Sequence, residues 1–155
     1  MDRSEILEAL ESSEFFRGLD KKDLEKIAGL CREETFEPGQ TIFLQGETGD
    51  RIYIVTEGQI ALERTVDLGT RKGNIVIGTV GKGRALGCWF TLLGKPHHFL
   101  SSALCRKQTK AVSFNGSEIR SLMLSNHALG FCLLERLCFI LRDRMQSVYG
   151  AMERI

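Results

Sequence analysis

The chain has 155 residues, of which 43% are hydrophobic and 26% charged, and its formal net charge is +1. This length is enough for one domain with its own core, so neither disulfides nor metals are needed for folding. The near-neutral charge excludes a general attraction to nucleic acid or membranes. No apolar run reaches membrane-spanning length, and the charged, amphipathic start MDRSEILEAL is unlike a signal peptide, so we expect a cytoplasmic protein.

The cysteines argue against a disulfide framework. Their number is odd, and no two of them have the C-x-x-C spacing of a zinc ribbon. We therefore expect free, buried thiols in a reducing compartment. Cys88 differs from the others because it follows a glycine at the start of a short apolar segment. The five are Cys31, Cys88, Cys105, Cys132 and Cys138.

Residues 1–31 have the pattern of two helices. Asp2, with Glu5 three residues later, is a capping pair placed just before an apolar helical face. A second helix is predicted in DKKDLEKIAGLC, with Asp20 as its N-cap.

Residues 32–115 have the composition of a β region. Eleven of the sixteen glycines lie from Gly39 to Gly94, where they separate short runs rich in β-forming residues. Strands of this kind, with turn signals every eight to twelve residues or so, favour a sandwich or barrel. The stretch DLGTRKGN, residues 67–74, is expected to be a mobile hairpin loop. The predicted strands are TIFLQG, RIYIVTEG, QIALERTV, NIVIGTV, FLSSALC and TKAVSF.

Residues 116–155 are predicted to be helical and carry two apolar stripes. One stripe is Leu133, Leu137 and Ile140. The other is a seam with alternating spacings of three and four, which is typical of coiled-coil a and d positions. Two stripes exceed what one domain face needs, so we expect one to pack on the β region and the seam to pair with a second subunit; the alternative is a helix packed only on its own domain. The seam consists of Phe131, Leu134, Cys138, Leu141, Met145, Val148, Met152 and Ile155.

The stretch FEPGQTIFLQGETGDRIYIVTEGQI, residues 36–60, resembles the cyclic-nucleotide-binding domain, the sensor module of regulators of the catabolite-activator and fumarate-nitrate-regulator class. The resemblance extends over nearly the whole chain. It implies one α+β domain over residues 1–155: an antiparallel β-roll, or jelly-roll-like barrel, with N-terminal helices before it and a long C-terminal helix after it. The residues that match the family pattern are Pro38, Gly39, Gly46, Glu47, Asp50, Tyr53 and Gly58.

The resemblance also implies a phosphate-binding cassette at residues 86–98. In the family it reads Phe-Gly-Glu, a run of small or apolar residues, and Pro-Arg: a short helix and the arginine bind the cyclic phosphate, and the glutamate binds the ribose 2′-hydroxyl. Here Gly87 and Pro96 are kept, but Leu86, Cys88 and His97 replace the Phe, Glu and Arg. Loss of one partner in a buried charge-assisted contact costs about 2–5 kcal/mol, or roughly 30-fold to several thousandfold in affinity. We therefore expect no tight binding of cyclic AMP in the usual manner.

Three interpretations of this pocket stay open. It binds a nucleotide or another anion through His97 and His98, with Arg84 or Lys95 at its rim. Alternatively, Cys88 and the two histidines bind zinc, copper or haem iron. In the third interpretation aromatic side chains fill the pocket, and the domain is a ligand-free dimerising scaffold. The candidate ligand-binding residues are Arg84, Leu86, Gly87, Cys88, Trp89, Pro96, His97 and His98.

Other functions find little support in the sequence. It contains no P-loop, G-x-S-x-G, H-E-x-x-H or EF-hand pattern, so we expect no enzyme. No helix-turn-helix follows the long helix, so we expect no direct DNA binding by this chain. Arg142 and Arg144 are expected to be solvated or to pair between helices. The prediction is a regulatory sensor domain in signal transduction or transcription regulation, homodimeric through its C-terminal helix, with an unknown ligand and no assigned cofactor.

Overall fold

The computed structural model describes residues 1–95 and 97–154. Two short helices come first, α1 (Arg3–Glu11) and α2 (Lys21–Ala28). The predicted capping pair of α1 is confirmed: the Glu5 N–H donates to the Asp2 carboxylate over 2.9 Å, and the Asp2 N–H donates to the Glu5 carboxylate over 2.7 Å. Asp20 does precede α2, but its side chain makes no capping hydrogen bond.

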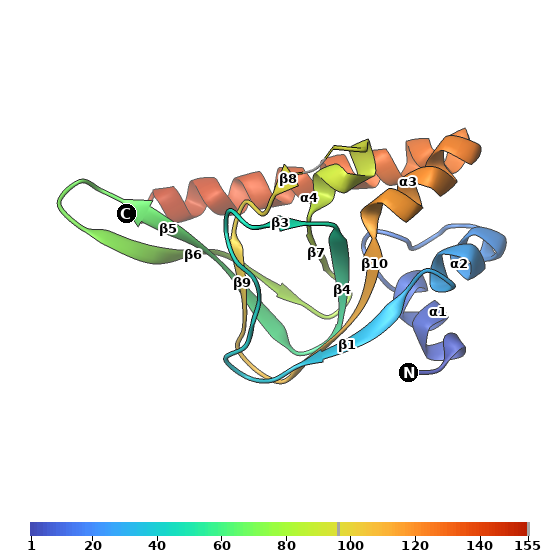
Figure 1. Ribbon diagram of the computed structural model, residues 1–155, viewed down its shortest axis with the longest axis horizontal. Helices are drawn as coiled ribbons and strands as arrows, with labels where there is room; N and C mark the ends of the chain where they lie inside the picture. The colour runs from blue at the N-terminus through green and yellow to red at the C-terminus, as the bar shows by residue number, and fades with distance from the viewer. Residues whose placement is uncertain (96, 155) are drawn as a thin grey trace.

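Two four-stranded antiparallel sheets form a β-roll (Figure 1). The first has the order β1–β10–β4–β7, with the bounds Arg32–Phe36, Thr109–Asn115, Arg51–Glu57 and Ala85–Gly87. The second has the order β2–β9–β5–β6, with the bounds Thr41–Phe43, Ser102–Cys105, Gln59–Asp67 and Lys72–Gly81. A short ladder pairs β3 (Thr48–Gly49) with β8 (His97–His98). The predicted α+β class and β-roll are confirmed, although the roll is not closed into a barrel.

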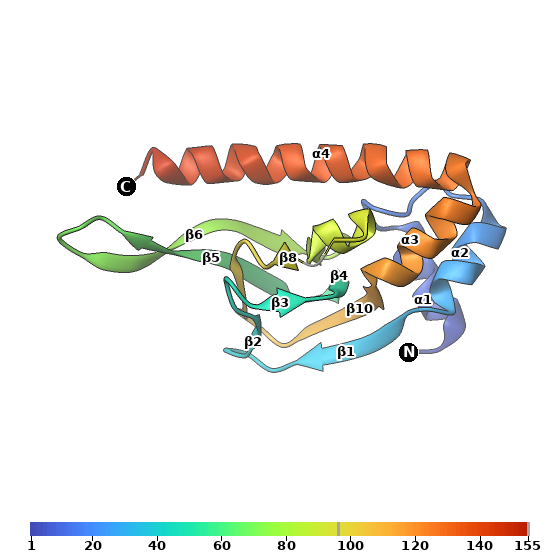
Figure 2. The ribbon, with the colours of Figure 1, turned by 45° about the horizontal axis from the view of Figure 1, so that its top comes forward.

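Strands β5 and β6 form a long hairpin that extends beyond the rest of the roll (Figures 1 and 2). Its pairing runs from Gln59 opposite Gly81 to Asp67 opposite Lys72. The expectation of a loop over residues 67–74 is therefore wrong at both ends of that stretch, because only residues 68–71 lie outside the strands. Cross-strand hydrogen bonds, which the local composition does not reveal, extend the ladder almost to the tip of the hairpin.

Helices α3 (Gly116–Ser125) and α4 (His127–Met152) complete the chain. Each begins with an asparagine cap: Asn115 accepts from the Ser117 N–H over 2.9 Å, and Asn126 accepts from the Leu129 N–H over 3.1 Å. Figure 2 shows α4 lying across the roll, with its C-terminal half beside the β5–β6 hairpin. Within residues 1–95 and 97–154, no helix is both long and apolar enough to cross a bilayer.

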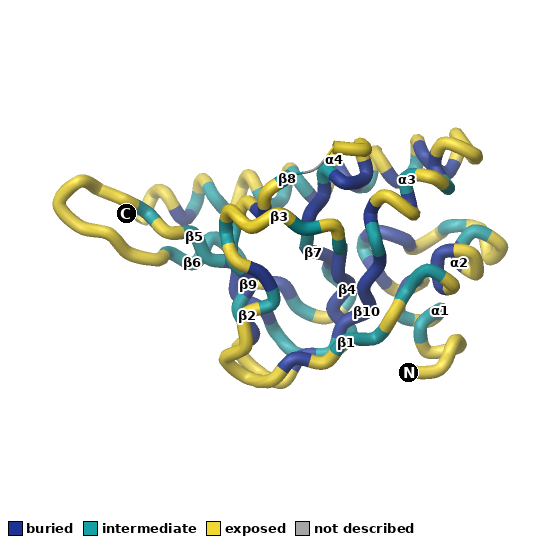
Figure 3. The backbone as a smooth tube through the Cα atoms, viewed as in Figure 1, coloured by how far each residue is buried: buried dark blue, intermediate teal, exposed yellow. Residues whose placement is uncertain are grey.

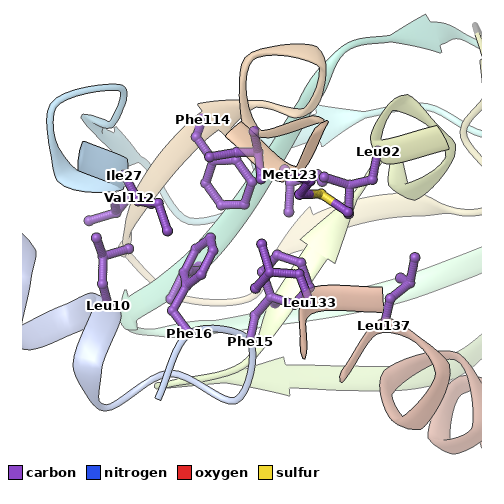
Figure 4. Packing of buried hydrophobic residues seen from close by; sticks show 14 of the residues in the cluster. Leu10, Phe15, Phe16, Ile27, Leu92, Val112, Phe114, Met123, Leu133 and Leu137 are labelled. Carbon is purple, nitrogen blue, oxygen red and sulfur yellow. The ribbon is translucent and has the colours of Figure 1, made fainter. Parts of the chain in front are cut away.

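The main hydrophobic core joins the N-terminal helices, the first sheet and α4. Its centre is aromatic: the ring centroids of Phe15 and Phe16 are 4.7 Å apart, and those of Phe16 and Phe114 are 5.2 Å apart (Figure 4). A second cluster, which includes Phe43, Val55 and Ile60, fills the inside of the roll. The first half of α4 is therefore attached to the roll through the main core.

The two stripes of α4 have different surroundings (Figure 3). Leu133, Leu137 and Ile140 are buried in the main core, which confirms that one stripe packs on its own domain. In the seam, Phe131 and Met152 are 71% and 58% exposed, and Leu134, Cys138 and Met145 are also exposed, whereas Leu141 and Val148 are half-buried. Ile155 lies outside the described residues. The seam thus changes its surroundings along the helix.

The aromatic core gives a direct test of the fold. Phe16→Ala removes a fully buried ring, so we expect the free energy of unfolding to fall by about 3–5 kcal/mol. Leu124→Ala, at a residue of α3 that is 60% exposed and lies outside the seam, serves as the control and should change it by less than about 0.5 kcal/mol. Urea unfolding followed by circular dichroism measures both. Equal losses in the two variants would contradict this placement of the core.

Candidate functional site

A cavity of about 410 Å³ lies between the roll and the C-terminal half of α4. One wall is the second sheet together with the segment from β7 to β9, and the facing wall is α4. Most of its lining is apolar, which is usual for small-molecule sites. The described lining residues are Phe43, Leu62, Arg64, Ile77, Leu86, Gly87, Cys88, Trp89, Phe90, His97, His98, Phe99, Leu100, Ser101, Leu141, Arg144, Met145, Val148 and Tyr149.

The cassette segment enters this cavity from β7. Gly87 pairs with Ile52 of β4, and a Cβ at Gly87 would lie 2.6 Å from the Arg51 carbonyl oxygen, so the close approach of the strands requires glycine. The expected short helix is a single 3₁₀ turn, η1 (Trp89–Leu93), ending at Gly94 with a φ of 73°. The Cys88 N–H donates to the Arg51 carbonyl over 3.1 Å, so this group is not available to an anion.

Cys88 is held by hydrogen bonding rather than presented as a nucleophile. Its side chain is buried, and its Sγ donates to the His97 carbonyl oxygen over 3.3 Å. Burial raises the pKa of the Cys88 thiol, while the backbone N–H of Gly49 and the contact with His97 oppose that shift. The neutral thiol is therefore the favoured form at physiological pH, and it is a weak nucleophile.

The two histidines lie on β8, beside the cavity. The ring centroid of His97 is 4.4 Å from that of Phe90, and its Nδ1 is 2.7 Å from the His98 carbonyl oxygen. The Nδ1 of His98 is 3.3 Å from the hydroxyl of Thr48. Over the described ranges, no group of three or more His, Cys, Asp or Glu side chains is arranged to hold a metal ion, so the geometry does not assemble Cys88, His97 and His98 as a ligand set.

Only some of the remaining predicted ligand-binding residues line the cavity. Leu86 and Trp89 line the cavity, although Trp89 also belongs to the main core and packs edge-on against Phe15, with centroids 5.8 Å apart. Arg84 is not among the lining residues, because its guanidinium points to Glu14, with the two charged atoms 3.7 Å apart. Pro96 lies outside the described residues.

Arg144 corrects an expectation from the sequence. It is neither solvated nor shared between helices: its side chain is 16% exposed, donates to the Ala85 carbonyl and lies 3.8 Å from the Glu14 carboxylate. Burial lowers the pKa of Arg144, and the nearby Arg84 adds to the shift. Arg142 does follow the expectation, because its exposed guanidinium lies 3.2 Å from Asp143.

Sequence reasoning missed Arg64. This residue lies on β5, lines the cavity and donates to the Leu100 carbonyl. The one signal in the sequence was a basic residue at an alternating position of a predicted strand, which normally indicates a solvated face. Three members of the predicted dimer seam also line the cavity: Leu141, Met145 and Val148. The seam therefore forms part of the site.

Thiol labelling tests the state of Cys88. The buried, hydrogen-bonded thiol with its raised pKa should react with iodoacetamide at pH 7.5 much more slowly than the half-buried Cys132, which lies outside the seam and is the internal control. Peptide mass spectrometry after timed labelling measures the two rates. Comparable rates would mean that Cys88 is accessible and would restore it as a candidate metal ligand.

The chain is similar in sequence to curated proteins of known function. Among curated relatives, it is 28% identical over 122 residues to the potassium channel KAT6 of Oryza sativa subsp. japonica, covering 79% of this chain and 20% of the channel. It is 25% identical over 135 residues to the CRP-like cAMP-activated global transcriptional regulator of Mycobacterium tuberculosis, covering 87% of this chain and 58% of the regulator. The chain thus spans well under two thirds of the length of these relatives.

Solved structures agree on the fold. A cyclic nucleotide-binding protein from Geobacter metallireducens GS-15 has a TM-score of 0.71 at 28% identity, covering 89% of this chain and 96% of that one. A cyclic nucleotide-binding domain from Methylobacillus flagellatus KT has a TM-score of 0.76 at 18% identity, covering 96% and 80%. The family model described as "Cyclic nucleotide-binding domain" matches residues 33–126, more than half of the chain. This chain therefore belongs to the cyclic nucleotide-binding domain family.

Proposed function

We propose that this domain is a regulatory sensor in which a small molecule occupies the cavity between the roll and α4 and thereby changes the position of α4. One observation supports this above all others: the cassette residues Leu86, Gly87 and Cys88 line the same cavity as Leu141 and Val148 of α4. A molecule bound there would contact both walls at once. Binding that favours one placement of α4 over another shifts the population between them.

Cyclic AMP itself should bind weakly, if its usual contacts are needed. Cys88 offers only a weak sulfur acceptor in place of the carboxylate of the family glutamate, and His97 is oriented by Phe90 and the backbone. The Cys88 N–H is bonded within the domain, which removes one backbone donor from the cassette. The retained part of the family function is therefore the coupling of a cavity to a helix rather than a particular nucleotide.

We further propose that the output is carried by a homodimer formed through α4. The exposed members of the seam support this: Phe131, Leu134, Cys138 and Met152 lie with the spacing that a second copy of the same helix would match. Because Met145 lies on the same seam and also lines the cavity, a ligand would act on the dimer contact through the helix itself. In the scaffold alternative, the cavity would have no such role.

The wider setting is proposed by analogy. The relatives named above are a potassium channel and a transcriptional regulator, so domains of this family serve different effectors. All five cysteines are free, which agrees with a reducing, cytoplasmic location. We infer a non-enzymatic role in signal transduction or transcription regulation. The ligand would bind in the cavity, and the dimer would contact the downstream protein or domain that is regulated.

Blocking the cavity tests the sensor. We expect isothermal titration to detect cyclic AMP or cyclic GMP binding that is weaker than micromolar, because the two key side chains are replaced. Val148→Trp should weaken this binding at least tenfold or so, since the indole would fill the space beside the cassette. Gln146→Trp, two residues earlier on the exposed side of α4 and not in the lining, is the matched control. Equal affinities in these two variants would place the ligand elsewhere.

Charge on the seam tests the dimer. Phe131→Glu should convert a dimer into a monomer in sedimentation experiments, because two buried carboxylates would face each other across the helix pair. The isolated fold should keep its stability, since Phe131 is 71% exposed. Leu124→Glu on α3, at a residue that is 60% exposed and off the seam, is the control. A wild-type chain that sediments as a monomer at high concentration would contradict the proposal.

A further inference from the structure

We propose that the cavity takes an organic anion with an apolar, aromatic body, and that Arg144 of α4 and Arg64 of β5 recognise its acidic group in place of the arginine that the cassette lacks. This inference rests on the proposed sensor function and names its ligand class. It is carried by the charges on the cavity wall, by the contacts of Arg144 and by the aromatic lining.

The charged side chains in the described lining of the cavity are all basic. Among the described residues that line the cavity are two arginines and two histidines, and none is aspartate or glutamate. A cavity with apolar walls and only basic side chains concentrates the field of those side chains, which favours an anion and disfavours a cation. A neutral apolar ligand would fill the space but would make no use of these charges.

Arg144 is a buried cation whose charge is only partly compensated. Its guanidinium lies 3.8 Å from Glu14, yet the same carboxylate lies 3.7 Å from Arg84 and also accepts the Ala85 N–H over 2.8 Å. One carboxylate therefore serves two guanidinium groups and a backbone donor. Burial is the main cause of the lowered pKa of Arg144, and the neighbouring Arg84 adds to it. Glu14 and Asp143 favour the charged form but do not offset the shift. An acidic group in the cavity would supply the missing charge.

Arg64 adds a second cation from the opposite wall. It donates to the Leu100 carbonyl, which is uncharged, and within residues 1–95 and 97–154 it forms no ion pair. Arg64 belongs to the sheet and Arg144 to the helix, and both residues are part of the lining of one cavity. Such groups bind carboxylates and phosphates through paired N–H donors, which a histidine cannot reproduce.

The rest of the lining suits a flat apolar body. Phe43 and Phe99 are stacked with centroids 3.9 Å apart, and Trp89, Phe90 and Tyr149 also border the space. Aromatic walls offer large contact areas to an aromatic ring or rings. The volume of about 410 Å³ lies in the range of ordinary small-molecule sites. The ligand class is therefore an aromatic carboxylate, sulfonate or phosphate.

Such a ligand would also explain how binding in the cavity changes the position of α4. The hydrogen bond from Arg144 to Ala85 and its ion pair with Glu14 tie α4 to β7 and to the segment after α1. An anion that draws Arg144 toward the cavity competes with both contacts. The helix would then be released from one attachment and held by another, which is the two-state behaviour that a sensor needs.

The test uses 1-naphthylacetate as the anionic probe and 2-(1-naphthyl)ethanol as its neutral match, titrated calorimetrically into the full chain at pH 7.5. We expect the carboxylate to bind more tightly than the alcohol. Arg144→Gln should weaken carboxylate binding by about 30-fold or more, the effect of removing one partner from a buried charge pair, and should leave alcohol binding unchanged. Arg142→Gln, an exposed arginine two residues away on the same helix, should change neither.

Two further variants keep the result interpretable. Arg64→Gln, on the hairpin, should weaken carboxylate binding without disturbing the contacts of α4, and Arg144→Lys should restore part of it if charge is what matters. Thermal unfolding of each variant shows whether it is folded. Equal binding of the carboxylate and the alcohol, no binding of the carboxylate at all, or carboxylate binding that survives both glutamine variants would overturn the inference. In each of these cases, cyclic nucleotide binding that is abolished by Val148→Trp would still support the sensor function. If neither a cyclic nucleotide nor either probe binds, both proposals are overturned.

Discussion

The burial of one stripe of α4 is the constraint on which the rest of the molecule depends. Leu133, Leu137 and Ile140 enter the core formed by the N-terminal helices and the first sheet, so the first half of the helix is fixed. The second half continues in the same direction across the open side of the roll because a helix is stiff over this length. The cavity exists because this second half covers it, and α4 is part of its wall for the same reason.

The elements that the sequence predicts well are those with local causes. The capping pair Asp2 and Glu5 and the strand pattern of residues 51–57 need only neighbours a few residues away, and both are found as expected. The hairpin at residues 67–74 was misjudged because its ends are held by cross-strand pairing, while its composition favours turns. The resemblance to the family predicted the order of these elements, since the fold is shared with a solved cyclic nucleotide-binding domain over 96% of this chain.

The site was less predictable, for a physical reason. Gly87 lines the cavity, and its lack of a Cβ is required where β7 meets β4. Arg144 was misjudged because the charge pattern of a helix does not tell which charges become buried by distant segments; here Glu14, far earlier in the chain, decides it. A seam with a regular spacing predicts a contact, but the spacing alone cannot say whether the contact is a second subunit or the domain's own cavity.

The position of Trp89 has a practical consequence for optical work on this protein. It is the sole tryptophan of the chain. It belongs to the main core, where it packs against Phe15, and it is also part of the lining of the cavity. Its emission wavelength depends on the polarity around the indole, so the same chromophore senses the loss of the core and the filling of the cavity. The two signals can be separated by their conditions, because a ligand changes the spectrum of the folded chain while denaturant changes it as the fold is lost. The chain thus contains its own spectroscopic reporter, without any introduced label.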